Sequence, residues 1–124
     1  MLSFLGKPLT NLQQFSAARA AFREALVVFQ QLQSTIGVIF SIEGVVNLSI
    51  AQGQLEESAQ LIAWATAARE SINNPRPVGE QEETDLALAN LRTALGEDTF
   101  HTAWMEGGRM TMEEAIQLAL HDVT

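Results

Sequence analysis

The sequence predicts an all-α fold, an α-α superhelix of helical hairpins that ends in a C-terminal helical cap. A self-similarity with a period of forty residues predicts the repeat, because large apolar positions return as large apolar ones and small positions return as small ones. Helical spacing of the apolar residues, with no run of strand-like alternation, indicates the same fold class. The matched positions are Leu2 and Ile42, Leu5 and Val45, Phe15 and Leu55, Ala18 and Ser58, Phe22 and Ile62, Ala25 and Ala65, and Leu32 and Ile72.

The length and the repeat indicate one domain over residues 1–124. It divides into a first hairpin at 1–33, a second hairpin at 34–72, a linker at 73–79 and the helical cap at 80–124. A third copy at the same period fails, so we interpret the cap as the atypical end that a repeat array needs to cover its last apolar face.

The first hairpin is expected to pair a weak helix with a strong one. Pro8 predicts that the helix over 2–12 is short, kinked or frayed. The following helix is clearer, because apolar residues at alternating steps of three and four form one stripe over 15–32. That stripe comprises Phe15, Ala18, Phe22, Ala25, Phe29 and Leu32.

The second hairpin has clear helix boundaries. Ser34 is a suitable N-cap for a helix over 36–52, and Gly53 tolerates the left-handed backbone common at helix C-termini. A helix over 55–72 follows. The prolines of the 73–79 linker stop this helix, because proline has no amide hydrogen to donate.

Three helices are predicted in the cap, the middle one short. Acidic residues occupy the start of the first, where the helix dipole favours them, and Gly96 ends it. We expect the second to be closed by Gly107 and Gly108. Thr111 and Glu114 have the spacing of a capping box at the start of the last helix.

The composition excludes several classes of protein. A hydrophobic content of 47% excludes a disordered chain, and the absence of cysteine excludes disulfides and thiolate chemistry and fits a reducing cytoplasm. The chain starts without a basic segment and a long apolar run, and no stretch is apolar enough to span a membrane. We therefore expect a soluble cytoplasmic protein without membrane contact.

The net charge of −8 belongs to the C-terminal third. Acidic and basic residues balance over 1–79, five of each, whereas 80–124 hold ten acidic residues against two arginines. A phosphate-binding face needs clustered lysine and arginine. We expect no direct binding of nucleic acid.

No constellation of residues predicts catalysis, a cofactor or a metal site. His101 lies near Glu97 and Asp98, but no second histidine stands at ligand spacing. The paired acids are expected in the first turns of helices, and no nucleophile accompanies them. These pairs are Glu56-Glu57, Glu82-Glu83 and Glu113-Glu114. We expect a protein that is not an enzyme.

The spacing within the repeat resembles the tetratricopeptide repeat (TPR), a helix–turn–helix hairpin. The period resembles that of the long-helix variety in kinesin light chains and many bacterial signalling proteins. The signature places are occupied by Leu5-Gly6, Phe15, Ala18, Phe22 and Ala25 in the first copy and by Val45-Val46, Gly53, Leu55, Ser58, Ile62 and Ala65 in the second.

Much of the chain after the first hairpin resembles the C-terminal TPR region of bacterial STAND-type ATPases and LuxR-family transcription regulators. The most specific run is Gly96-Glu97-Asp98, Phe100, Ala103-Trp104 and Glu106-Gly107, followed by Met112-Glu113-Glu114-Ala115. The chain has neither a GxxxxGK[ST] phosphate loop nor a basic recognition helix. The resemblance therefore implies an interaction arm without ATPase or DNA-binding parts.

In this family the first helices of the repeats line a concave face. The resemblance implies that Asn11, Glu43, Asn47 and Ile50 contribute to this face here. A polar, slightly acidic groove favours an extended peptide or another polar partner.

The two tryptophans are open to different interpretations. Trp64 lies off the innermost stripe, so it either packs against the cap, which we favour, or lies in the partner groove. Trp104 shares a helix face with Phe100, and we expect it in the core.

We expect a protein–protein interaction module, either a regulatory or signalling scaffold or the detached C-terminal arm of a larger regulator. The alternative is a small-ligand sensor that binds in a cavity between the hairpins and the cap. Because only two hairpins are visible, the chain is either a piece of a longer regulator or a small relative that forms a homodimer through its first hairpin.

Overall fold

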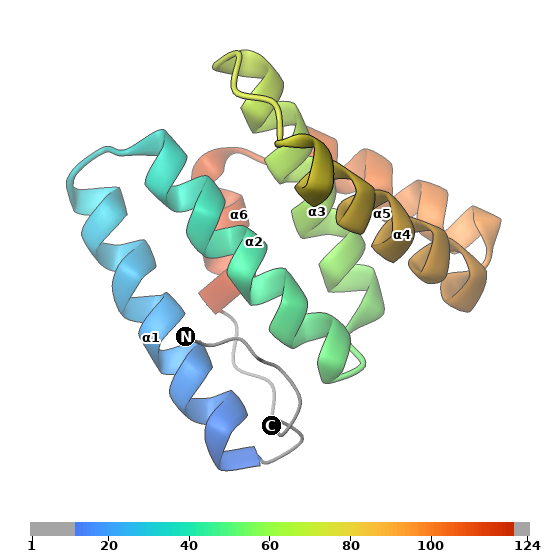
Figure 1. Ribbon diagram of the computed structural model, residues 1–124, viewed down its shortest axis with the longest axis horizontal. Coiled ribbons are helices and arrows are strands. Elements are labelled where there is room, and N and C mark those ends of the chain that lie inside the picture. Colours follow the sequence, from blue (N-terminus) through green and yellow to red (C-terminus); the bar gives the residue numbers. More distant parts are fainter. Residues whose placement is uncertain (1–11, 121–124) are drawn as a thin grey trace.

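A computed structural model of the chain describes residues 12–120, and this part contains α-helices and no strands. The predicted all-α class is confirmed (Figure 1). The helix expected over 2–12 falls outside the described residues, apart from Leu12. The helices are α1 (Leu12–Gln31), α2 (Thr35–Ala51), α3 (Leu55–Ser71), α4 (Val78–Leu95), α5 (Glu97–Arg109) and α6 (Met112–Leu120).

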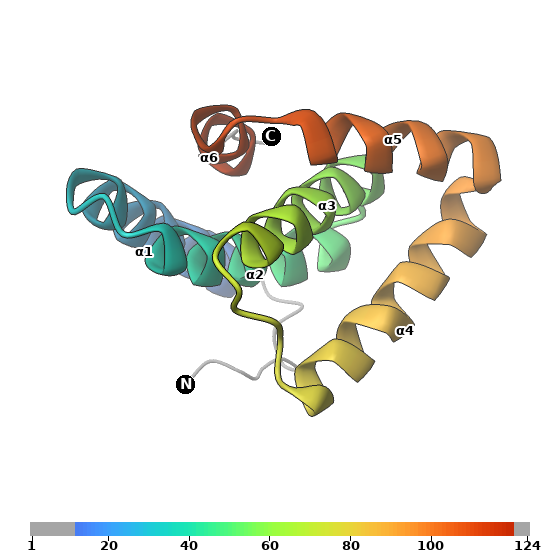
Figure 2. The same ribbon diagram turned by 90° about the horizontal axis from the view of Figure 1, so that it is seen from above.

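The first three helices form a layer of antiparallel neighbours, α1 beside α2 and α2 beside α3 (Figure 1). The other three do not extend this layer in the same manner. Figure 2 shows α4 starting on one side of this layer and running outward past α3 to the other side, where α5 and α6 return across the layer. α5 packs extensively along α3, and α6 contacts α1, α2 and α3. α5 and α6 therefore fold back over the layer formed by α1, α2 and α3.

α1 and α2 approach closely because α2 has glycine where α1 has phenylalanine. The ring of Phe22 lies against Gly44, and the ring of Phe29 lies against Gly37. A Cβ atom at either glycine would collide with the facing ring. The two phenylalanines are seven positions apart on α1, and the two glycines are seven positions apart on α2. Seven residues make two helical turns, so the two contacts lie along the same side of the antiparallel helix pair.

The predicted stripe on α1 is partly wrong. Phe22 and Phe29 are half-buried as expected, but Leu32 follows the last helical residue and is 67% exposed. The innermost apolar side chain is Leu26, which is completely buried. Arg19 is also on the buried face, at 8% exposure.

The helix caps and the turn predicted from the sequence are present in the structure. Ser34 Oγ accepts a hydrogen bond from the Gly37 amide at 3.2 Å, so Ser34 caps α2. The Thr111 amide donates to Glu114 Oε1 at 2.9 Å, and the Glu114 amide donates to Thr111 Oγ1 at 3.1 Å. The capping box at α6 is therefore confirmed. Gly53, with φ of +81°, makes the predicted turn.

The start of α4 differs from the prediction. Pro77 is the residue before the helix, and Val78 is its first residue, so α4 begins inside the expected linker. Glu80 is the acidic residue of its first turn. Glu82 and Glu83 lie beyond that turn, and the prediction that they belong to it is wrong.

The prediction that Gly107 and Gly108 close α5 is also wrong. The helix continues to Arg109, and Gly107 is buried inside it. A Cβ atom at Gly107 would collide with the backbone carbonyl of Gln60 on α3. Gly107 is needed for the close approach of two helices, whereas Gly108 faces open space.

Both tryptophans belong to the packed interior. Trp64 is 5% exposed, in a core cluster that also contains Phe100 of α5. Of its two interpretations, burial is therefore correct, and Trp64 is not a groove residue. Trp104 is half-buried and stacks on Phe100, with ring centroids 5.9 Å apart.

Candidate interaction groove

A groove of about 330 Å³ opens between α2 and α4, with Ile62 of α3 between these two walls. We call it the α2–α4 groove. Three of the predicted partner-binding residues, Glu43, Asn47 and Ile50, are in its lining. The full lining is Glu43, Gly44, Val46, Asn47, Ile50, Ile62, Arg76, Glu80, Glu83, Thr84 and Ala87.

The α2 wall exists because one face of this helix is left out of the core. Glu43, Asn47 and Ile50 follow at steps of four and three, which places them on one face. Ile42 and Val45 point to the other side and are buried. Asn47 is exposed and Ile50 is half-buried, so both are accessible from the groove.

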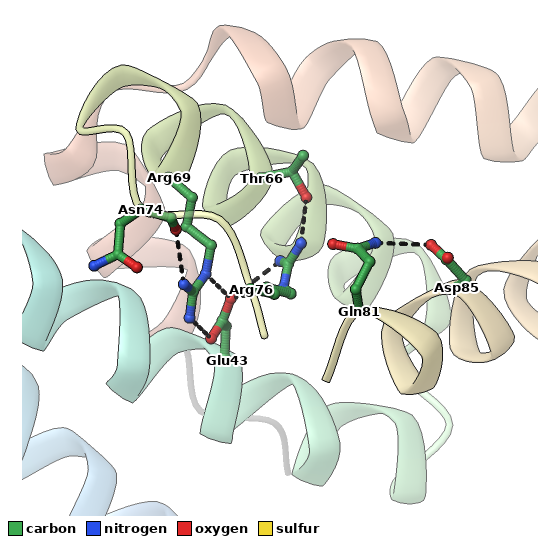
Figure 3. Close-up of polar contacts among 7 residues, drawn as sticks. All are labelled: Glu43, Thr66, Arg69, Asn74, Arg76, Gln81 and Asp85. Carbon is green, nitrogen blue, oxygen red and sulfur yellow. Dashed lines mark hydrogen bonds and ion pairs between the residues drawn. The ribbon is translucent and has the colours of Figure 1, made fainter. Parts of the chain in front are cut away.

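Glu43, in the lining of the groove, binds two arginines. Figure 3 shows these contacts. Arg69 donates from Nε and Nη2 to the two carboxylate oxygens, each at 2.8 Å. Arg76 approaches Oε2 with Nε at 3.1 Å and Nη2 at 3.0 Å. The arginine side chains are only 4% and 5% exposed, whereas Glu43 is 23% exposed. Such charge-assisted, two-pronged contacts are the strong class of hydrogen bond.

The remaining arginine hydrogens join the linker to α3. Arg69 Nη1 donates to the Asn74 carbonyl at 3.0 Å, and Arg76 Nη1 donates to Thr66 Oγ1 at 3.1 Å (Figure 3). The hydrogen bond with Glu43 raises the pKa of Arg69 above its ordinary value against the opposing effect of burial, and the charges of Glu43 and Glu80 add to the rise. Together with Glu43, the two arginines hold the chain that leads into α4.

The α4 wall is formed by a helix with few core contacts. Glu80, Glu83, Thr84 and Ala87 share a face toward the groove. Leu91 is the fully buried side chain of this helix. The first half of α4 is therefore positioned mainly by the arginine cluster at its start and by the packing around Leu91 toward its end.

The structure thus brings together some of the predicted site residues and not others. Asn47 and Ile50 lie in the groove as accessible side chains, while Glu43 is occupied by internal ion pairs. Trp64 is in the core, and Asn11 lies outside the described residues.

Sequence reasoning missed both arginines and the acidic wall of α4. A clue was present for Arg69, because the residue forty positions earlier in the repeat is Phe29. A charged residue at an apolar repeat position needs a buried partner. No comparable clue identifies Glu80 or Glu83, because their role depends on where α4 lies relative to α2.

Within residues 12–120, no group of three histidine, aspartate or glutamate side chains is arranged to hold a metal ion. His101 is exposed on α5. Of the helices described, none is long and apolar enough to cross a bilayer.

The chain was compared with known proteins at three levels. No protein-family model matches it, and neither a curated protein nor a solved structure gives a significant match.

Proposed function

We propose that this protein is a non-enzymatic protein–protein interaction module that binds an extended segment of its partner in the α2–α4 groove. The observation that carries the proposal is the accessible face of α2 at Asn47 and Ile50, opposite the open wall of α4. The lining is mixed, with apolar side chains beside amide, hydroxyl and carboxylate groups. This mixture suits a peptide, whose backbone needs hydrogen-bond partners while its side chains bury apolar surface.

We further propose a TPR-type module that acts in the bacterial cytoplasm as an arm of a signalling regulator. The order of antiparallel neighbours α1, α2 and α3 supports the hairpin architecture. The sequence resemblance to STAND-type and LuxR-family regulators supports the biological setting, and the lack of cysteine agrees with a reducing compartment.

Phage display of random peptides on the purified protein tests the groove. Selected peptides are expected to bind the wild type, and Asn47→Trp is expected to weaken binding at least about tenfold, because the indole fills the groove from an exposed helical position. Gln30→Trp, exposed on α1 outside the groove, is the matched control and is expected to bind like the wild type. Circular dichroism verifies that both variants are folded. Equal binding by all three proteins would rule out the groove as the peptide site.

A small-ligand sensor is the second candidate, because the groove volume of about 330 Å³ is at the lower end for ligand pockets. A small molecule that binds the folded state raises the melting temperature. A thermal-shift screen of metabolites separates the candidates. A metabolite that stabilises the wild type but not Asn47→Trp would favour the sensor, and stabilisation by selected peptides alone favours the interaction module.

A further inference from the structure

We propose that the α2–α4 groove selects a partner segment that carries a basic side chain next to an aliphatic one. This inference rests on the proposed function and deepens it, because it names the chemistry of the segment that is bound. It follows from which charges in the groove are used internally and which are left accessible.

The positive charges near the groove are used internally. Arg69 and Arg76 are at least nine-tenths buried, and both donate to Glu43. Arg69 also donates to the Asn74 carbonyl, and Arg76 also donates to Thr66 Oγ1. An incoming anionic group therefore finds no accessible guanidinium, and displacing Glu43 would leave two buried cations without their carboxylate.

The accessible charges are negative. Glu80 and Glu83 are exposed on the groove wall, and among residues 12–120 neither carboxylate has a hydrogen bond or a close ion pair. The charge of Glu80 also acts on Arg69 from a distance, whereas no such interaction involves Glu83 in this part of the chain. The dipole of α4 accounts for Glu80 but not for Glu83, because the effect falls off within the first turn. α4 has no basic residue before Arg92, so the wall keeps its negative sign along the groove.

The rest of the lining defines the neighbouring position. Ile50 on α2 and Ala87 on α4 supply accessible apolar surface, and the buried Ile62 lies between the two walls. Asn47, on the same wall as Ile50, has an amide that can both donate to and accept from a peptide backbone. An extended segment can place an aliphatic side chain on this apolar surface and a lysine or arginine near the two carboxylates.

Three synthetic peptides test the selectivity. Each has ten residues of serine and valine, with lysine, glutamine or glutamate at the same three positions, and carries a fluorescein label. Fluorescence anisotropy at low salt is expected to show binding of the lysine peptide at least about tenfold tighter than that of the glutamate peptide, because complementary charge favours one and like charge opposes the other.

Two double variants with equal charge changes identify the carboxylates responsible. Glu80→Gln with Glu83→Gln is expected to weaken lysine-peptide binding about tenfold, to the level of the glutamine peptide. Glu82→Gln with Asp85→Asn changes exposed residues of the same helix outside the groove lining, and less than about threefold weakening is expected. Similar weakening by both double variants would overturn the inference, because the overall negative charge of α4, rather than the two groove carboxylates, would then explain the preference.

The remaining outcomes separate this inference from the proposed function. If all three peptides bind equally and Asn47→Trp abolishes binding, the groove binds peptides but does not select a basic one. If Asn47→Trp leaves binding of the lysine peptide unchanged, both the groove function and the selectivity are wrong. If none of the three peptides binds, the selectivity is wrong, and the phage-selected peptides decide the groove function separately.

Discussion

Gly107 and Gly108 are adjacent in α5 but have opposite surroundings. Gly107 is buried where α5 approaches the backbone of α3 at Gln60, and Gly108 is exposed with open space around its Cβ position. At Gly107 the packing requires a residue without a side chain. At Gly108 nothing prevents a larger residue, so a substitution there changes only the helix propensity.

We predict opposite effects of alanine at these two positions. Gly107→Ala should lower the free energy of unfolding by about 3 kcal/mol, because the obstructing atom is a backbone carbonyl that cannot rotate away. Gly108→Ala should be neutral or raise it by up to about 1 kcal/mol, since alanine is the better helix former. Urea denaturation followed by tryptophan fluorescence measures both. Equal effects of the two substitutions would contradict the close approach of α5 and α3.

At the scale of elements, α4 depends on a few contacts at its ends. Its first turn is joined to the body by the linker that carries Arg76, and Arg76 and Arg69 share Glu43 on α2. Exposed apolar residues such as Val78 and Leu86 show how little of this helix is covered. The position of the start of α4, and with it one end of the α2–α4 groove, therefore depends on the Glu43 carboxylate.

Glu43→Ala should lower the free energy of unfolding by about 3 kcal/mol, because it leaves two buried guanidinium groups without their shared partner. Hydrogen exchange should show the largest loss of protection at the start of α4. Glu83→Ala is the matched control, since it removes an exposed acid of the same groove, and it should change stability by less than about 0.5 kcal/mol. A Glu43 variant as stable as the control would mean that the ion pairs do not anchor α4.

At the scale of the whole molecule, α1 and α6 are joined across a long stretch of sequence. Arg19 donates to the Ala119 carbonyl at 3.4 Å, and Arg23 donates to the Leu120 carbonyl at 2.9 Å. Arg19 also donates to Gln52 Oε1 at 3.2 Å, beside the turn between α2 and α3. Burial lowers the pKa of Arg19, although the charge of Glu57 opposes this effect.

We predict that removing this connection destabilises the entire chain in one transition. Arg19→Met keeps most of the side-chain volume but removes the donors, and it should lower the free energy of unfolding by about 2 kcal/mol. Arg109→Met, exposed at the end of α5, is the control for loss of a positive charge. Urea curves from circular dichroism and from tryptophan fluorescence should coincide for both variants. Separate transitions would show that α6 and the hairpins unfold independently.

The helices and most of their boundaries can be predicted from the amino-acid sequence without a structure. Each helix-end feature involves residues only a few positions apart, so it can be predicted from the local sequence alone. Examples are the cap at Ser34, the turn at Gly53 and the capping box at Thr111. The failures at this level are small, such as the start of α4 inside the expected linker.

The contacts between side chains of different helices depend on the tertiary structure and could not be predicted from the sequence. Glu43 and its two arginines are 26 and 33 residues apart, and Gly107 faces Gln60 of a different helix. The periodicity of a helix says which residues share a face, but not which helix covers that face. The repeat ends after α3, and long-range packing alone directs α4, α5 and α6. The path of this part of the chain explains the burial of Trp64, the ion pairs of Glu43 and the acidic wall opposite Asn47.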